Sequence, residues 1–394
     1  MTSVFPKISF GKKWTFFLLG VLLAVLMIQK LCAPPSPVTG SRYGVSRAAL
    51  EPFDSARVLH LYGWTGFIPP EVLADFEALT GIRVIFDVFD TNELLEAKLF
   101  AGNSGYDLVF PTAWPYLARQ LQGGVYQPLD QERLRSVWCL DPELLHRLET
   151  IDPDHQYAVP YQWGIMGLGI RAQKVKKILG HIPHSWGLVF DPKYAAQLHS
   201  ARIELCDAPG ELIPAVLSFL GRDPESASLE DLEAAAEALR RIRPYITKFN
   251  PSGYESLASG TATVVIGTSG DILRARRQAV REGWGKDVAF ISPEEGTALW
   301  MDVMAIPKGA PHPHNAHAFI TYLLHPRVMA AVTTFTLCAN AVPASWRYLD
   351  ASIRNNVLIY PTLKMRRKCY LERNMPAAYE AARTRVLTQI KAGA

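Results

Sequence analysis

Two side chains with the chemistry to bind a cation stand two residues apart in one apolar segment. Trp300 and Asp302 lie in the run Ala298-Leu-Trp-Met-Asp-Val-Met-Ala-Ile306, which is predicted to be a strand. Residues two apart on a strand face the same side. A carboxylate in such a segment is costly unless it is paired, and an aromatic ring beside it adds a π face for a cation. Asp302 is therefore expected to have a partner in the folded protein.

A second group of aromatic and hydroxyl side chains comes after apolar segments in the first third of the chain. These residues are Trp64, Thr65, Phe67, Thr112 and Trp114. Rings and hydroxyls gathered at one place indicate a bound small molecule, and their surroundings favour a cationic one.

The elements that must position this second group form a β-α-β-α-β unit between Val58 and Pro115. Strands are predicted at residues 58–62, 82–89 and 106–110, and helices at 69–81 and 94–102, each helix closed by a glycine. Such a unit builds a mostly parallel sheet that gathers ligands at the carboxyl ends of its strands. The second group lies at those ends.

A second α/β region follows a long apolar, glycine-interrupted stretch, residues 157–170, which we expect to cross from one lobe to another. Ser228-Leu-Glu-Asp231 is a capping signature for a helix that Pro244 ends. Other predicted elements are strands at 201–206, 263–267, 288–292 and 298–307, a helix at 207–220, a helix starting at 268–271, and two helices within 315–335.

The composition is that of a globular protein large enough for two domains. The chain has 394 residues, 49% hydrophobic and 20% charged. Residues 1–50 hold six basic residues and no acid, so removing them from 41 basic and 37 acidic residues leaves 35 against 37, a net charge of −2. This balance excludes a basic nucleic-acid footprint on the folded part.

The N-terminus has the pattern of a targeting segment. Lys7, Lys12 and Lys13 precede an apolar run from Trp14 to Ile28. Residues 1–33 are therefore a signal peptide or an uncleaved membrane anchor, two alternatives that the pattern leaves open, and residues 34–56 are expected to be a linker. Either alternative exports the body of the protein. The five cysteines lack metal-type spacing, and buried, unpaired thiols are favoured over disulfides.

Several motifs, in order along the chain, resemble one family. They include Tyr62-Gly-Trp-Thr-Gly-Phe67, Val159-Pro-Tyr-Gln-Trp-Gly164 and Met301-Asp-Val-Met-Ala-Ile-Pro307, with further matches at residues 88–93, 105–112, 124–130, 140–145, 207–209, 265–267, 270–271 and 339–341. From about residue 57 to the C-terminus the chain is similar to the periplasmic polyamine-binding proteins of ABC importers, most of all to the putrescine-binding type.

The resemblance implies an α/β type II periplasmic binding protein fold, with two lobes joined by crossing hinge strands. Lobe 1 would comprise residues 57–161 and 287–341, and lobe 2 residues 162–286 and 342–394. It implies a monomer without cofactor or catalysis, which captures a polyamine in the periplasm and delivers it to an ABC permease in the inner membrane. A membrane-tethered sensor or interaction protein on the same scaffold is the alternative.

The resemblance also assigns ligand-binding residues. Aromatic walls would come from Trp64, Phe67, Trp114 and Trp300, hydroxyls from Thr65 and Thr112, and amine-binding carboxylates from Glu211, Asp271, Asp302 and, by a gap-dependent match, Glu372. Helix capping or a solvated face remains the alternative for Asp271, Glu211 and Glu372, and ordinary core packing for Trp114. If these acids bind a ligand, Asp271 and Asp302 should not be paired with the protein's own Arg or Lys.

Four positions depart from the family pattern. Gly66 stands where the family has an acid, Phe67 replaces a Tyr, Thr268 a Trp and Cys338 a Tyr. These changes put putrescine itself in doubt, and spermidine-like or modified amines are equally good candidates.

Two weaker signals point elsewhere. His312, His314 and His317 have a spacing that zinc sites use, but exposed histidines at a helix start are the favoured interpretation, so no metal is expected. No nucleophile–base arrangement emerges, so the protein is not expected to be an enzyme.

Overall fold

The structure, a computed structural model, describes residues 40–134, 140–250 and 253–393. The predicted signal peptide or anchor, residues 1–33, lies outside these ranges. Within them, no helix is long and apolar enough to cross a membrane.

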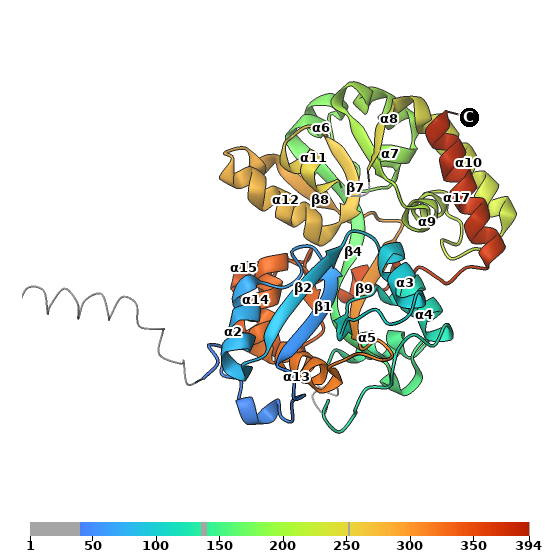
Figure 1. Cartoon of the computed structure of the whole chain (residues 1–394). Coiled ribbons are helices and arrows are strands. Elements are labelled where there is room, and N and C mark those ends of the chain that lie inside the picture. The colour runs from blue at the N-terminus through green and yellow to red at the C-terminus, as the bar shows by residue number, and fades with distance from the viewer. Residues whose placement is uncertain (1–39, 135–139, 251–252, 394) are drawn as a thin grey trace, which may run out of the picture.

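Two α/β lobes share one mixed sheet whose strand order is β2-β1-β3-β9-β4-β7-β5-β6 (Figure 1). In the first lobe, β1 (Val58–Trp64) pairs in parallel with β2 (Arg83–Phe89) and β3 (Leu108–Val109). In the second lobe, β5 (Ile203–Cys206) pairs in parallel with β6 (Ile246–Asn250) and β7 (Val264–Thr268). Three further strands are β8 (Val288–Ile291), β10 (Ala339–Asn340) and β11 (Cys369–Tyr370).

Two long antiparallel strands, β4 (Ala158–Arg171) and β9 (Thr297–Ala305), join the lobes. The first half of β4 pairs with β9 and β10, and its second half, from Met166, pairs with β7 and β8. Figure 1 shows β4 running from one lobe into the other. The expectation that residues 157–170 cross between lobes is confirmed.

Glycine is needed in β4 where other side chains cross it. A Cβ atom at Gly164 would lie 2.7 Å from the ring of Trp300 on β9, and one at Gly167 would meet the backbone of Ile291. Real Cβ atoms do not approach so closely, so these glycines let large side chains pack flat on the crossing strand.

Helices cover the sheet in both lobes. Those packed in the first lobe are α2 (Pro70–Thr80), α3 (Asn92–Phe100), α4 (Ala118–Gln122), α5 (Pro142–Leu148), α13 (Pro313–Leu323) and α14 (Pro326–Thr336), followed by the short α15 (Ala351–Arg354) and α16 (Leu363–Arg366). Those of the second are α6 (Ala172–Leu179), α7 (Gly187–Phe190), α8 (Pro192–Leu198), α9 (Pro209–Phe219), α10 (Leu229–Ile242), α11 (Tyr254–Ala258), α12 (Ser269–Arg281) and α17 (Ala377–Ala392).

Each lobe has its own apolar core. The first core takes buried residues between 45 and 163 and between 299 and 359, together with Leu273 of α12, and the second takes residues between 166 and 291 and between 375 and 390. A smaller third cluster, between residues 165 and 290, includes buried side chains of α11 and α12. Two segments pack differently from expectation. Val45 and Leu50, in the expected linker, are buried in the first core, and so are Val342 and Ile359, although residues 342–394 were expected in lobe 2. These segments pack on the first lobe because burying their apolar side chains there is favourable.

The histidine cluster is used in structural contacts. His312 donates its backbone N–H to Asp107 and has its ring Nδ1 3.0 Å from the same carboxylate, His317 accepts from the Asp130 amide, and His314 contacts Arg133. No group of three or more metal-binding side chains comes together in the described ranges. Among the described cysteines, Cys206, Cys338 and Cys369 are free thiols.

Candidate ligand-binding site

Asp302 lies on the crossing strand β9, where its backbone meets Thr112 at the end of β3. The Thr112 hydroxyl donates to Oδ1 of Asp302 at 2.7 Å, and Asn92, the first residue of α3, holds Thr112 through its side-chain amide. Asp302 is 6% exposed, and no described Arg, Lys or His forms an ion pair with it. Burial raises its pKa to about 7, while the hydrogen bond from Thr112 acts in the opposite direction.

Two tryptophans of the predicted site have an unsatisfied indole N–H. The Nε1 atoms of Trp64 and Trp300 are buried and have no hydrogen-bond partner in the described part of the chain. Trp64 ends β1 and packs edge-on against Phe89, and Trp300 lies over Gly164. A buried N–H without a partner is costly, so both rings have donors to offer to a ligand.

The other residues predicted at the carboxyl ends of the first strands are divided between surface and core. Thr65 is exposed. Phe67 and Trp114 are buried in the first core, where Phe67 packs against Phe110 and Tyr161. The structure therefore places the rings of Phe67 and Trp114 in the apolar core of the first lobe.

Carboxylates of the second lobe gather at the start of α9. Glu211 is in the first turn of α9, and no hydrogen bond or ion pair of its carboxylate is found among the described residues. Burial raises the pKa of Glu211 to about 8, and its neighbours Glu372, Asp271 and Glu93 act in the same direction. Glu372 lies so close to Gly210 that a Cβ atom there would clash with Oε1.

Glu372 is partly neutralised by the protein itself. Arg383 of α17, which is buried, pairs with Glu372 at 3.1 Å and with Glu380 at 2.6 Å. Burial nevertheless raises the pKa of Glu372 to about 7, against the effect of Arg383. One guanidinium thus serves two carboxylates.

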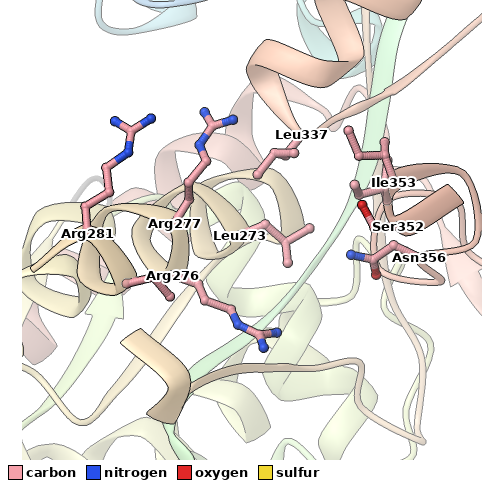
Figure 2. A pocket seen from close by; sticks show the side chains of 10 residues that line it. Leu273, Arg276, Arg277, Arg281, Leu337, Ser352, Ile353 and Asn356 are labelled. Carbon is pink, nitrogen blue, oxygen red and sulfur yellow. The ribbon is translucent and has the colours of Figure 1, made fainter. Parts of the chain in front are cut away.

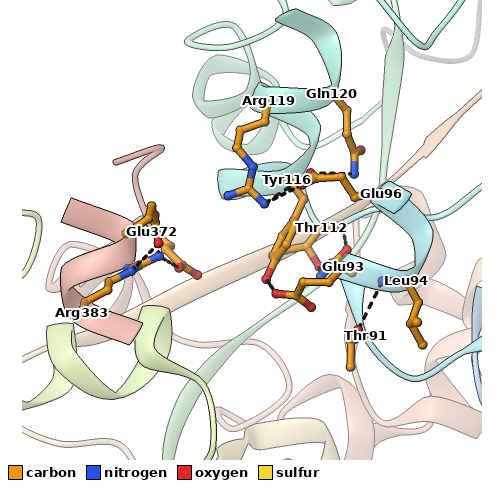
Figure 3. A network of polar contacts seen from close by, with 12 residues as sticks. Thr91, Glu93, Leu94, Glu96, Thr112, Tyr116, Arg119, Gln120, Glu372 and Arg383 are labelled. Carbon is orange, nitrogen blue, oxygen red and sulfur yellow. Dashed lines mark hydrogen bonds and ion pairs between the residues drawn. The ribbon is translucent and has the colours of Figure 1, made fainter. Parts of the chain in front are cut away.

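The first lobe places a further carboxylate opposite these. Figure 3 shows Tyr116 donating to Glu93 on one side and the Glu372–Arg383 pair on the other. The pKa of Tyr116 is raised well above its usual value by burial and then by Glu93 and Glu372, so the two sides are close enough to interact. The site prediction did not include Glu93, although it ends the motif at residues 88–93 that carried the resemblance.

Asp271 lies in the first turn of α12, behind the cap of Thr268, whose hydroxyl accepts from its amide. Its carboxylate forms an ion pair with Arg274, one turn further along the helix, at 2.5 Å. The expectation that the site acids have no cation from the protein therefore fails for Asp271. Cys338 packs against Gly270 beside this pair, and burial raises its pKa to about 12, so the thiol is neutral.

Two cavities lie along α12, and none of the ten predicted ligand-binding residues lines either. One of about 490 Å³ is bordered by Arg276, Arg277 and Arg281 together with residues of α15 (Figure 2). The other, of about 230 Å³, is lined by Tyr254, Arg274, Arg277, Gln278, Arg281 and Phe335. Arg274 lines the second cavity and also pairs with Asp271, so it connects the arginines of α12 to the candidate site.

Comparisons with known proteins agree with this arrangement. Residues 104–372 match the family described as bacterial extracellular solute-binding protein. The chain is 40% identical over 359 residues to the putrescine-binding periplasmic protein SpuD of Pseudomonas aeruginosa, covering 90% of this chain and 96% of that one. It is also 40% identical over 341 residues to the putrescine-binding periplasmic protein PotF of Escherichia coli, covering 86% and 92%.

A solved structure shares the fold. The spermidine/putrescine ABC transporter substrate-binding protein PotD of Streptococcus pneumoniae superposes with a TM-score of 0.74 at 21% identity, covering 86% of this chain and 99% of that one. The type II fold of two lobes, predicted from the sequence, is confirmed.

The chain belongs to the family of bacterial extracellular solute-binding proteins. Proteins of this class bind a solute and do not transform it, which agrees with the expectation of no enzymatic activity. The relatives are periplasmic, which supports the predicted location outside the cytoplasm.

Proposed function

We propose that the protein captures a polyamine between its two lobes and delivers it to an ABC permease in the inner membrane. The observation that carries the proposal is Asp302, a buried carboxylate on the strand that joins the lobes, with a hydroxyl as its only described partner. A buried carboxylate without a counter-charge is unfavourable, and an ammonium group beside Trp300 would remove that penalty.

Like-charged groups on both lobes support the same ligand class. Glu93 comes from the first lobe, and Glu211 and Glu372 come from the second. A chain with two or more ammonium groups would contact both lobes at once and would bind the closed arrangement better than an open one. The names of the relatives fit this class of ligand and transport, and they do not favour the tethered-sensor alternative.

The lobe boundaries, the monomeric state and the N-terminal tether belong to the same proposal. Lobe 1 comprises the residues of the first core except Leu273, including the segment up to about residue 360. Lobe 2 comprises those of the second core with α11, α12 and α17. A signal peptide or anchor at residues 1–33 carries both lobes to the periplasmic side.

A thermal-shift screen tests the proposal. Purified protein is heated with putrescine, cadaverine, agmatine, spermidine or spermine at concentrations up to millimolar. A ligand that binds only the folded state raises the melting temperature in proportion to RT ln(1 + [L]/Kd). At least one amine should stabilise the protein, and the absence of any shift across the series would overturn the proposal.

A further inference from the structure

Arg274 supplies a cation to the candidate site from within the protein. It lies three residues after Asp271 on α12, a spacing that places both side chains on one face of the helix. Its Nη2 donates to Oδ1 of Asp271, and the two side chains are only 31% and 27% exposed. The charge of Asp271 is therefore already neutralised when no ligand is present.

The first lobe leaves room for this guanidinium. Gly66 follows β1 with φ of +67°, and a Cβ atom there would lie 3.3 Å from Nη1 of Arg274. A longer side chain at position 66 would compete with the guanidinium for that space. The ring of Tyr254 lies on another side, 5.4 Å from the guanidinium carbon, within the range of a cation–π contact.

Other carboxylates of the candidate site have no cation among the described residues. Within the described ranges, Asp302 and Glu211 have no ion-pair partner, and Glu93 is bonded to the neutral hydroxyl of Tyr116. Glu211 and Glu93 are near each other and come from different lobes. Within the described ranges, the carboxylates left for a ligand cation are therefore Asp302 and the group formed by Glu211 and Glu93.

We propose that Arg274 determines specificity by occupying the cation position at Asp271. This inference rests on the proposed function. The ligand class is a chain-like amine that places one ammonium at Asp302 and the next toward Glu211 and Glu93. An amine that would bridge Asp302 and Asp271 finds the second carboxylate already taken.

Isothermal titration of putrescine and spermidine tests the inference on the full mature chain and its variants. Arg274→Gln frees the carboxylate of Asp271, so spermidine, with three charges, should bind at least about tenfold more tightly than to the parent. Adding Asp271→Asn to this variant should reverse the gain. Arg276→Gln, an exposed arginine of the same helix, is the matched control for a general loss of positive charge.

A second variant covers the case in which Arg274→Gln does not fold. Gly66→Asp adds a carboxylate beside Nη1, and aspartate tolerates the positive φ better than most residues. The guanidinium then faces two acids, one negative charge becomes available to the ligand, and spermidine affinity should again rise. Circular dichroism and ligand-free melting curves verify that each variant is folded.

Two results would overturn the inference while leaving amine capture intact. One is a spermidine affinity of Arg274→Gln and Gly66→Asp no higher than that of the Arg276→Gln control. The other is binding of 4-aminobutyrate by the parent that Arg274→Gln abolishes, since the guanidinium would then receive a ligand carboxylate. If the parent binds no amine, it is the proposed function that fails, and the inference fails with it.

Discussion

Replacing Asp302 with asparagine separates the contribution of its charge to binding from its contribution to the fold. The substitution keeps an oxygen that can accept the hydrogen bond from Thr112, now 2.7 Å long, and it keeps the volume of the side chain. Only the negative charge is lost. Because Asp302 is 6% exposed, a ligand ammonium beside it would form a pair largely shielded from water.

The magnitude follows from that burial. Two unit charges about 4 Å apart attract by roughly 4 kcal/mol at an effective dielectric constant near 20. With a pKa of about 7 the carboxyl is mostly ionised at slightly alkaline pH, so losing its remaining proton costs only a few tenths of a kcal/mol. Removing one member of a buried charge pair costs about 2–5 kcal/mol. We expect a loss of about 2–4 kcal/mol, which is roughly 30- to 1,000-fold in Kd.

Ligand-free stability should change in the opposite direction. Asp302→Asn removes a buried charge that has no cation among its described neighbours, so the melting temperature without ligand should stay or rise. Titration calorimetry gives the affinity, and a thermal melt gives the stability. Asp154→Asn is the control, since Asp154 is exposed and has φ of +63°, a conformation that asparagine adopts readily. Binding within about threefold of the parent, or a variant that melts well below it, would refute the reasoning.

Three further outcomes follow from the same site. Amine affinity should fall as pH drops from 8 to 6, because Asp302 (pKa about 7) and Glu211 (pKa about 8) must release protons to bind a cation. Asp302 alone accounts for about tenfold, and a flat calorimetric profile would contradict this. Without ligand, the raised pKa values of Asp302 and Glu211 stabilise the fold fully below about pH 4, and this stabilisation is lost as pH rises through 7–8. The melting temperature should therefore decrease over that window, and an increase would be inconsistent with these shifts. Gly164→Ala would press on the Trp300 ring at 2.7 Å and should cost about 1–3 kcal/mol in a denaturant melt, whereas Gly40→Ala, in open space, should be neutral; equal effects would argue against the packing.

Much of the fold was readable from local signals. Ser228 accepts from the first turn of its helix, as the capping signature at 228–231 predicted, and the helix predicted to start at 268–271 begins at Ser269 behind the cap of Thr268. The apolar run at 157–170 is the crossing strand β4 because a strand buried on both faces needs no polar alternation. By contrast, the strand predicted at 106–110 is a strand only over Leu108–Val109, although the flanking amides of Asp107 and Phe110 also donate to β1.

The outer elements of the second lobe were not predicted because they bury little. In α6 only Val175 is buried, and β6, an edge strand, buries only Ile246. Short segments with a single buried side chain carry little apolar signal, and their structure depends on the lobe that they cover. Pro244 was correctly read as ending α10, but it gave no indication that an edge strand begins two residues later.

The pairing of Asp271 shows where sequence reasoning about the site ends. The spacing of Asp271 and Arg274 on one helix was visible, and so was the unusual Gly66. The free energy of forming an exposed i, i+3 ion pair is close to zero. The spacing alone therefore does not decide between a solvated arginine and one that lies in the site. That choice depends on the empty space beside Gly66, which belongs to the other lobe and is defined only by the tertiary structure.

The distribution of charge also gives a physical reason for coupling between ligand capture and lobe closure. Glu93 on the first lobe and Glu211 and Glu372 on the second repel one another, and this repulsion adds to burial in raising the pKa of Glu211. In the absence of a cation, this repulsion is relieved either when the carboxylates take up protons or when the lobes separate. An ammonium group that contacts acids from both sides removes the repulsion only when the lobes are together, so its binding energy is realised in the closed state. A cation held by one lobe alone would bind without favouring closure.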